Sequence, residues 1–249
     1  MLRCALRLAV LAGGISTSVP AATLDRDWAR VYNRPGPESA LAIWPAPGGG
    51  VDIVAARNGE MVYLRYDQTG TLTAERTTGI GIGSLRFAVL ASDGVGGFVL
   101  AAQQDSAGQY WLVQLRVLAT GGVAWRTSLG SFIEYPAAMR IANGEVYLGV
   151  DEDYYTTYDP SLHITDLSTG ASLCSRVGAG GHYQRITDMH VREGGGVTLI
   201  GTGQCYAASH QGKADAEGGD ECFSWLTDFT DDCLVTRDRY YPSHHYFSS

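Results

Sequence analysis

Four carboxylates and three tyrosines lie within the nine residues from Asp151 to Asp159. Hard cations such as Ca²⁺ prefer several oxygen ligands at close range, and the carboxylates of Asp151, Asp153 and Asp159 could supply them. The spacing of an EF-hand loop is not present, because neither the sixth-position Gly nor the twelfth-position Glu follows. The segment is therefore either a Ca²⁺ site or a solvated acidic loop, and the sequence suggests no other cofactor.

The aromatic residues of this segment suggest a binding surface. Rings of Tyr154, Tyr155 and Tyr158 on an exposed loop would stack on sugars or contact a protein, although they could equally pack against a neighbouring element. A second polar stretch, residues 206–221, contains His210 and is either a binding loop or a tolerated insertion. We take these four residues as candidate contacts with a protein or a glycan.

Signatures of catalysis are scarce. The sequence has no Gly-x-Ser-x-Gly elbow, no His-Glu-x-x-His and no phosphate-binding Gly-x-x-x-x-Gly-Lys. The first strands of the expected units offer chiefly Arg86, Arg140, Asp188, His190 and Arg192, of which Asp188 and His190 form a possible acid–histidine pair. A non-catalytic binding module is favoured, and a small hydrolase, lyase or quinone-dependent enzyme is the alternative.

The N-terminus and the charge point to an exported protein. Residues 1–22 combine Arg3 and Arg7 with a short apolar stretch and a small-residue exit, which is typical of a secretory signal peptide and too short to span a bilayer. The formal net charge is −8, and loss of the two arginines makes it more negative. A secreted or periplasmic protein without membrane insertion is expected, and a nucleic-acid partner is disfavoured because phosphate binding needs concentrated positive charge.

Four cysteines remain in the mature chain: Cys174, Cys205, Cys222 and Cys233. An even number in an exported protein predicts two disulfides, for which three connectivities exist. A Cys205–Cys222 bridge would close the base of residues 206–221 and leave Cys174 to pair with Cys233. A zinc site is the alternative, but neither Cys-x-x-Cys nor a paired histidine spacing is present.

The elements that position these residues are regularly spaced. Apolar strands open at Val51, Phe98, Val146 and Val197, each after a turn rich in Gly or Asn-Gly, so the period is 47 to 51 residues. Repeats of this length with four short strands each are typical of propeller blades. We therefore predict an all-β, β-propeller-like fold of about four four-stranded antiparallel units. The units are residues 41–79, 87–130, 136–178 and 186–239.

Two stretches resemble known propeller repeats. Trp28 to Gly36, running on to Ala40 to Ile43, resembles the opening of the bacterial SBBP (β-propeller repeat) proteins. Leu118 to Gly130 resembles the pyrroloquinoline-quinone-like (PQQ-like) repeat, in which a Thr-Gly turn leads to a tryptophan, here Trp125, that packs between blades. The resemblance covers about residues 24–240 and implies a scaffold shared by exported binding modules, assembly factors and some quinoenzymes. Leu72 and Leu173 replace the tryptophan in two other units.

The ends of the repeat array leave its closure open. A single domain over residues 23–240 is expected, with a closing strand at 27–33 and a C-terminal tail at 241–249. A closed ring, an open arc and two chains completing an eight-bladed ring are all compatible with the sequence, so the protein is a monomer or a homodimer. The loops expected between second and third strands lengthen along the chain, from residues 58–59 through 105–109 and 151–159 to 206–221, which favours a binding face on the third and fourth units.

Overall fold

The computed structural model describes residues 38–106, 108–130, 134–154, 157–177, 184–193, 195–206 and 221–243. Side chains are described throughout these ranges except at residues 38, 153, 154, 157–159, 184, 204–206, 221–223 and 242–243. The predicted signal peptide and closing strand lie outside the described residues. Every regular element in the described ranges is a β-strand, and no helix there could cross a membrane.

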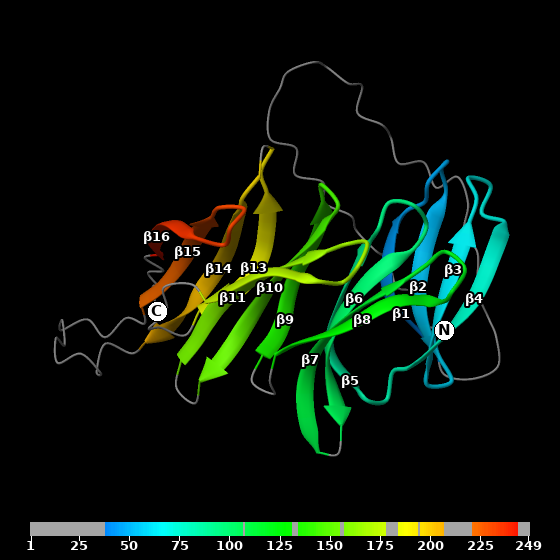
Figure 1. The fold of residues 1–249 in the computed structure, drawn as a ribbon, viewed down its shortest axis with the longest axis horizontal. Helices are drawn as coiled ribbons and strands as arrows, with labels where there is room; N and C mark the ends of the chain where they lie inside the picture. Colours follow the sequence, from blue (N-terminus) through cyan, green and yellow to red (C-terminus); the bar gives the residue numbers. More distant parts are fainter. Residues whose placement is uncertain are drawn as a thin grey trace, which may run out of the picture.

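Sixteen strands form four antiparallel sheets, each made of four strands that are consecutive in the chain (Figure 1). The first sheet contains β1 (Glu38–Pro45), β2 (Val51–Arg57), β3 (Glu60–Tyr66) and β4 (Leu72–Gly81). The second contains β5 (Leu85–Ser92), β6 (Phe98–Ser106), β7 (Gln109–Val117) and β8 (Val123–Gly130). The third contains β9 (Glu134–Ala142), β10 (Glu145–Tyr154), β11 (Thr157–Asp166) and β12 (Ser172–Val177). The fourth contains β13 (Gln184–Val191), β14 (Val197–Tyr206), β15 (Glu221–Phe229) and β16 (Val235–Ser243).

The predicted fold class is confirmed. The second strand of three sheets begins at the predicted residue, and β10 begins one residue before Val146. The Asn-Gly turns explain this accuracy, because both residues of such a turn need positive φ. Asn58 and Asn143 have φ angles of 49° and 54°, and each is followed by a glycine that also has positive φ.

The prediction of loops is wrong for two of the connections between strands. The sequence predicts loops between second and third strands at residues 105–109 and 151–159. In the structure the strands extend into both ranges, and Ser106 is paired with Gln109 and Tyr154 with Thr157. Both stretches are rich in polar residues and so look like loops. Backbone hydrogen bonding between antiparallel strands does not require apolar side chains, so the hairpins extend beyond the apolar core.

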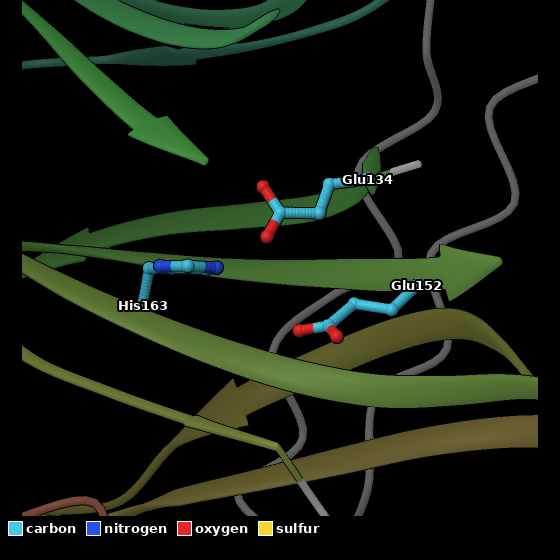
Figure 2. Close-up of side chains that lie close together, drawn as sticks. All are labelled: Glu134, Glu152 and His163. Carbon is cyan, nitrogen blue, oxygen red and sulfur yellow. The ribbon is translucent and has the colours of Figure 1, made fainter. Parts of the chain in front are cut away.

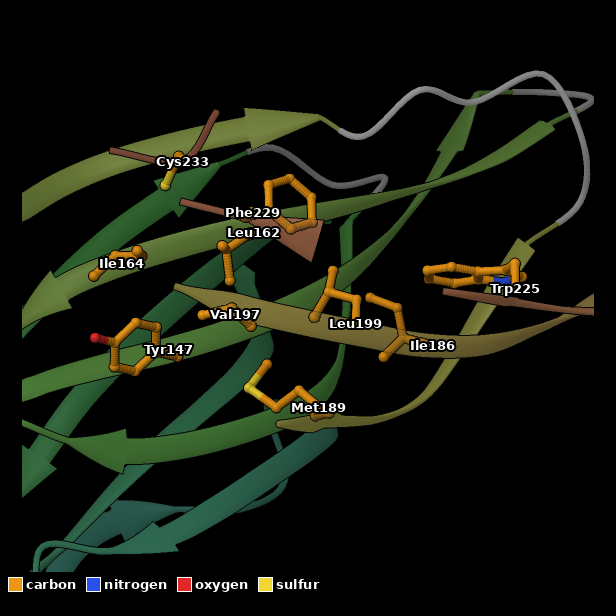
Figure 3. Packing of buried hydrophobic residues seen from close by; sticks show 11 residues of the cluster. Tyr147, Leu162, Ile164, Ile186, Met189, Val197, Leu199, Trp225, Phe229 and Cys233 are labelled. Carbon is orange, nitrogen blue, oxygen red and sulfur yellow. The ribbon is translucent and has the colours of Figure 1, made fainter. Parts of the chain in front are cut away.

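Neighbouring sheets pack face to face in chain order. Three apolar clusters fill the spaces between them, and the cluster between the third and fourth sheets is shown in Figure 3. It brings Tyr147 and Leu162 of the third sheet against Leu199 and Trp225 of the fourth. Contacts between first strands join β1 to β5, β5 to β9 and β9 to β13, and in the described part of the chain the propeller-type array is an open arc (Figure 1).

The same contact between neighbouring sheets occurs three times. In each case the outer strand of one sheet meets the last turn of the next: β4 meets Gly121, β8 meets Gly170, and β12 meets Cys233. At the third position the contact is covalent, because Cys174 and Cys233 form a disulfide with Cα atoms 6.1 Å apart. That predicted pairing is confirmed. The side chains of Cys205 and Cys222 lie outside the described residues.

Trp125 illustrates the second of these contacts. Its Nε1 donates a hydrogen bond of 2.8 Å to the Leu167 carbonyl, and its ring lies against Gly170, where an added Cβ would be 2.6 Å from a ring atom. Thr127 also donates from Oγ1 to the Gly170 carbonyl. A tryptophan therefore packs between the second and third sheets.

Candidate functional site

The acidic segment singled out in the sequence forms the end of the β10–β11 hairpin. Asp151 is paired with Pro160, Glu152 with Asp159 and Asp153 with Tyr158. The side chains of Asp153, Asp159, Tyr154 and Tyr158 are not described, and Tyr155 and His210 lie outside the described residues. Their assignment to a cation or a binding partner stays a prediction.

Asp151 is the one predicted cation ligand whose side chain is described. It is buried, and its Oδ1 accepts a hydrogen bond of 2.9 Å from the backbone N–H of Ile186 in the fourth sheet. Burial raises the pKa of Asp151 to about 6, although the hydrogen bond from Ile186 and the charge of Arg185 oppose the shift. This carboxylate therefore joins the third sheet to the fourth.

The neighbouring residue, Glu152, points to the opposite face of the sheet because side chains alternate along a strand. There it meets Glu134, its direct partner on β9, and His163 of β11. One ligand atom from each of the three side chains lies within 4.8 Å of the other two. Figure 2 shows the three side chains reaching from adjacent strands toward a common point. We call them the Glu134–Glu152–His163 cluster.

The strand register builds this cluster. His163 is paired with Leu148, and Leu148 lies on the same face of β10 as Val150 and Glu152. Leu148 and Val150 pack against the second sheet, so the cluster occupies the same interface between sheets. At the edge of the interface, the Glu134 carboxylate lies against Gly130. A Cβ added at Gly130 would collide with this carboxylate, so the glycine leaves space for it.

The Glu134–Glu152–His163 cluster is mostly buried, and Glu134 is its partly exposed member. His163 is 3% exposed and Glu152 is 4% exposed. Burial lowers the pKa of His163 to about 4, so its imidazole is uncharged at neutral pH. Burial, together with the negative charge of Glu152, raises the pKa of Glu134 to about 7. Among the described residues, neither His163 Nε2 nor Glu134 Oε2 has a hydrogen-bond partner.

Sequence reasoning missed this group. Glu152 was counted among the four acidic residues but was not chosen as a ligand, and Glu134 and His163 were not singled out. They are separated from Glu152 by 18 and 11 residues, so no linear spacing marks them. A repeat alignment that assigns register across β9, β10 and β11 is the signal that could have found them.

A second site lies where the four sheets come together. The first strands β1, β5, β9 and β13 line a cavity of about 310 Å³ that is open to solvent. Its walls are Leu41 and Ala42 of β1, residues 88–90 of β5, residues 137–140 of β9, and Thr187 and Asp188 of β13. Most of these residues are apolar or small, and the two charged residues are Arg140 and Asp188.

Arg140 and Asp188 form an ion pair inside this central cavity. Arg140 Nη2 donates to Asp188 Oδ1 at 2.6 Å, and Nη1 donates to the Met139 carbonyl at 3.0 Å. The two charged side chains are 51% and 58% exposed, so solvent reaches them. Asp188 also accepts a hydrogen bond from the Met189 N–H. In the described part of the chain its carboxylate thus engages Arg140 instead of His190, and the acid–histidine pair considered for catalysis is not formed.

Comparison with known proteins yields structural likenesses only. No model of a protein family matches the sequence, and no curated protein does. Among solved structures, similarity is found to a quinohemoprotein alcohol dehydrogenase from Comamonas testosteroni, with 13% identity, a TM-score of 0.49, and coverage of 81% of this chain and 35% of the dehydrogenase.

Two further structures are similar in part. Drosophila plexin A, solved in complex with semaphorin 1b, has 10% identity and a TM-score of 0.43 over 78% of this chain and 41% of that one. The Synechocystis apocarotenoid oxygenase has 12% identity and a TM-score of 0.39 over 76% and 46%. The chain spans less than half the length of these three proteins. Its own four sheets, which follow one another in an open arc and together line the central cavity, make it an all-β protein of the β-propeller type.

Proposed function

We propose that this chain is an exported binding module of the propeller type that takes a neutral glycan in its central cavity and does not catalyse a reaction. The observation that carries the proposal is the half-exposed Arg140–Asp188 pair in a cavity to which all four sheets contribute. A volume of about 310 Å³ falls within the usual range of small-molecule sites and is sufficient for a sugar unit.

The chemistry of the cavity suits a ligand that is polar but uncharged. The charges of Arg140 and Asp188 cancel, while the guanidinium has five N–H donors, of which two are engaged among the described residues. Hydroxyl groups can both accept from the guanidinium and donate to the carboxylate. The exposed side chain of Leu41 offers an apolar wall to the C–H face of a sugar ring. The net charge of −8 disfavours anionic glycans.

A second contact is proposed on the third and fourth units. Tyr154, Tyr155 and Tyr158, with His210, are the residues that we propose for stacking on further sugar units or for contact with a protein. A bound Ca²⁺ at Asp151, Asp153 and Asp159 belongs to the same proposal.

Export and repeat type complete the proposal. The Cys174–Cys233 disulfide supports an oxidising compartment, because such bonds persist outside the cytosol. The signal-like residues 1–22 agree with a secreted or periplasmic location. The position of Trp125 between two sheets supports a repeat of the PQQ-like or SBBP type.

The test is a titration with neutral oligosaccharides. Purified mature protein is screened on an array of neutral and acidic glycans. The affinity of each neutral glycan that binds is then measured by calorimetry for wild type, Arg140→Gln and Asp188→Asn. Loss of one charged hydrogen bond, worth about 1.5–3 kcal/mol, weakens affinity by about 10-fold to 100-fold. An exposed ion pair contributes little to folding, so both variants stay folded.

Arg126→Gln is the matched control, because Arg126 is an exposed arginine outside the cavity. Its affinity for the hit should equal that of wild type. Equal affinity in all four proteins would refute the cavity as the binding site. Conversion of the oligosaccharide, followed by NMR, would instead support the enzyme alternative.

A further inference from the structure

We propose that Glu134, Glu152 and His163 bind one divalent transition-metal ion between the second and third sheets. This inference does not depend on glycan binding at the central cavity, because no residue of the Glu134–Glu152–His163 cluster lines that cavity. The ion would join the beginning of β9, the end of β10 and the middle of β11.

Geometry is the first argument. The three side chains offer one imidazole nitrogen and two carboxylate oxygens within 4.8 Å of one another. Protein ligands lie about 2.0–2.2 Å from a bound zinc ion, so that ligand atoms around it are roughly 3.5 Å apart. Small rotations of the two glutamate side chains, which converge on His163 in Figure 2, achieve this spacing.

Burial is the second argument. His163 is almost completely buried, and its Nε2 has no hydrogen-bond partner among the described residues although it points into the cluster. Buried polar atoms are nearly always satisfied, so an unpartnered imidazole nitrogen facing two carboxylates calls for an electrophile. Two carboxylates side by side in a buried interface repel each other, and a divalent cation would neutralise both.

The donor set indicates the kind of metal. Imidazole is a ligand for Zn²⁺, Fe²⁺ and similar ions, whereas Ca²⁺ and Mg²⁺ prefer oxygen ligands alone. One nitrogen and two oxygens from the protein therefore favour a first-row transition metal such as Zn²⁺ over Ca²⁺. Three protein ligands leave at least one coordination position for water.

The experiment titrates chelator-stripped, full-length mature protein with Zn²⁺ in a calorimeter, and with Co²⁺ under visible absorption. Wild type should bind one ion per chain, and excess Ca²⁺ should not displace it. Glu152→Gln and His163→Asn should weaken Zn²⁺ binding by more than about 100-fold, the upper end of the effect of losing a supporting residue. His190→Gln removes an exposed histidine outside the cluster and should leave affinity unchanged.

X-ray absorption of the wild-type zinc complex keeps the proposal testable if the variants fail to fold. The expected first shell contains one imidazole nitrogen and oxygen atoms. A sulfur shell would place the ion on cysteines and overturn the proposal, as would the absence of zinc binding or an equal loss of affinity in His190→Gln.

Discussion

Gln114 is the residue at which burial and hydrogen bonding disagree most. It is fully buried on β7, and neither Oε1 nor Nε2 of its side chain has a partner among the described residues. It lies on the same face of β7 as Leu112, toward the third sheet. Leaving a polar group buried without a partner costs about 1–3 kcal/mol.

Gln114→Met should therefore stabilise the protein. The methionine fills nearly the same volume with an apolar, flexible side chain and removes two unsatisfied polar atoms. We expect the free energy of unfolding in urea to rise by about 1 kcal/mol. The matched control is Gln103→Met, because Gln103 is equally buried but donates from Nε2 to the Glu134 carbonyl at 2.8 Å, so its replacement should destabilise. Destabilisation by both changes would show that Gln114 has a partner.

At the level of elements, the fold depends on the contact between an outer strand and the last turn of the next sheet. Gly170 makes this contact for the second and third sheets, with a φ of 73° and the Trp125 ring against its Cα. Gly59 has a similar φ of 82°, but an added Cβ would meet no atom within 4 Å. Alanine substitution at Gly59 therefore tests backbone strain alone, whereas substitution at Gly170 tests backbone strain together with a steric conflict.

Gly170→Ala should destabilise the protein more than Gly59→Ala. Both changes force alanine into a left-handed conformation, which costs about 1 kcal/mol. Only Gly170→Ala also displaces Trp125, and overpacking adds about 1–3 kcal/mol. Urea unfolding of the two variants measures the difference. Equal free energies of unfolding would mean that Trp125 can move away from residue 170 without loss of stability.

At the level of the whole molecule, four sheets in an open arc raise the question of a partner copy. The face of the first sheet that points away from the second carries Val62 and Leu64, and both are buried within this single chain. Strands from all four sheets of the same chain also line the central cavity. The outer face of the first sheet therefore does not need a second subunit to cover Val62 and Leu64.

We therefore expect a monomer. Light scattering on a sizing column should give the mass of one chain, with or without Zn²⁺. A dimer would show that two arcs complete each other, and the glycan site would then have to be sought between the two chains.

The repeat period, the strand positions and the all-β class could be predicted from the sequence, because turns such as Asn58-Gly59 are dictated by backbone sterics within a few residues. The Cys174–Cys233 pair was also accessible, by elimination. The length of the β10–β11 hairpin could not be predicted from the sequence. Its polar end is stabilised by pairing between the two strands, which its composition does not indicate.

Tertiary structure alone decided the sites. Alternation along β10 sends Asp151 to the fourth sheet and Glu152 to the second, a difference of one residue that composition does not reveal. Glu134 and His163 reach Glu152 only through the register of three strands, and Arg140 meets Asp188 only because two sheets share a cavity. Local turns depend on neighbouring residues in the chain, whereas these sites depend on pairing and packing between distant ones.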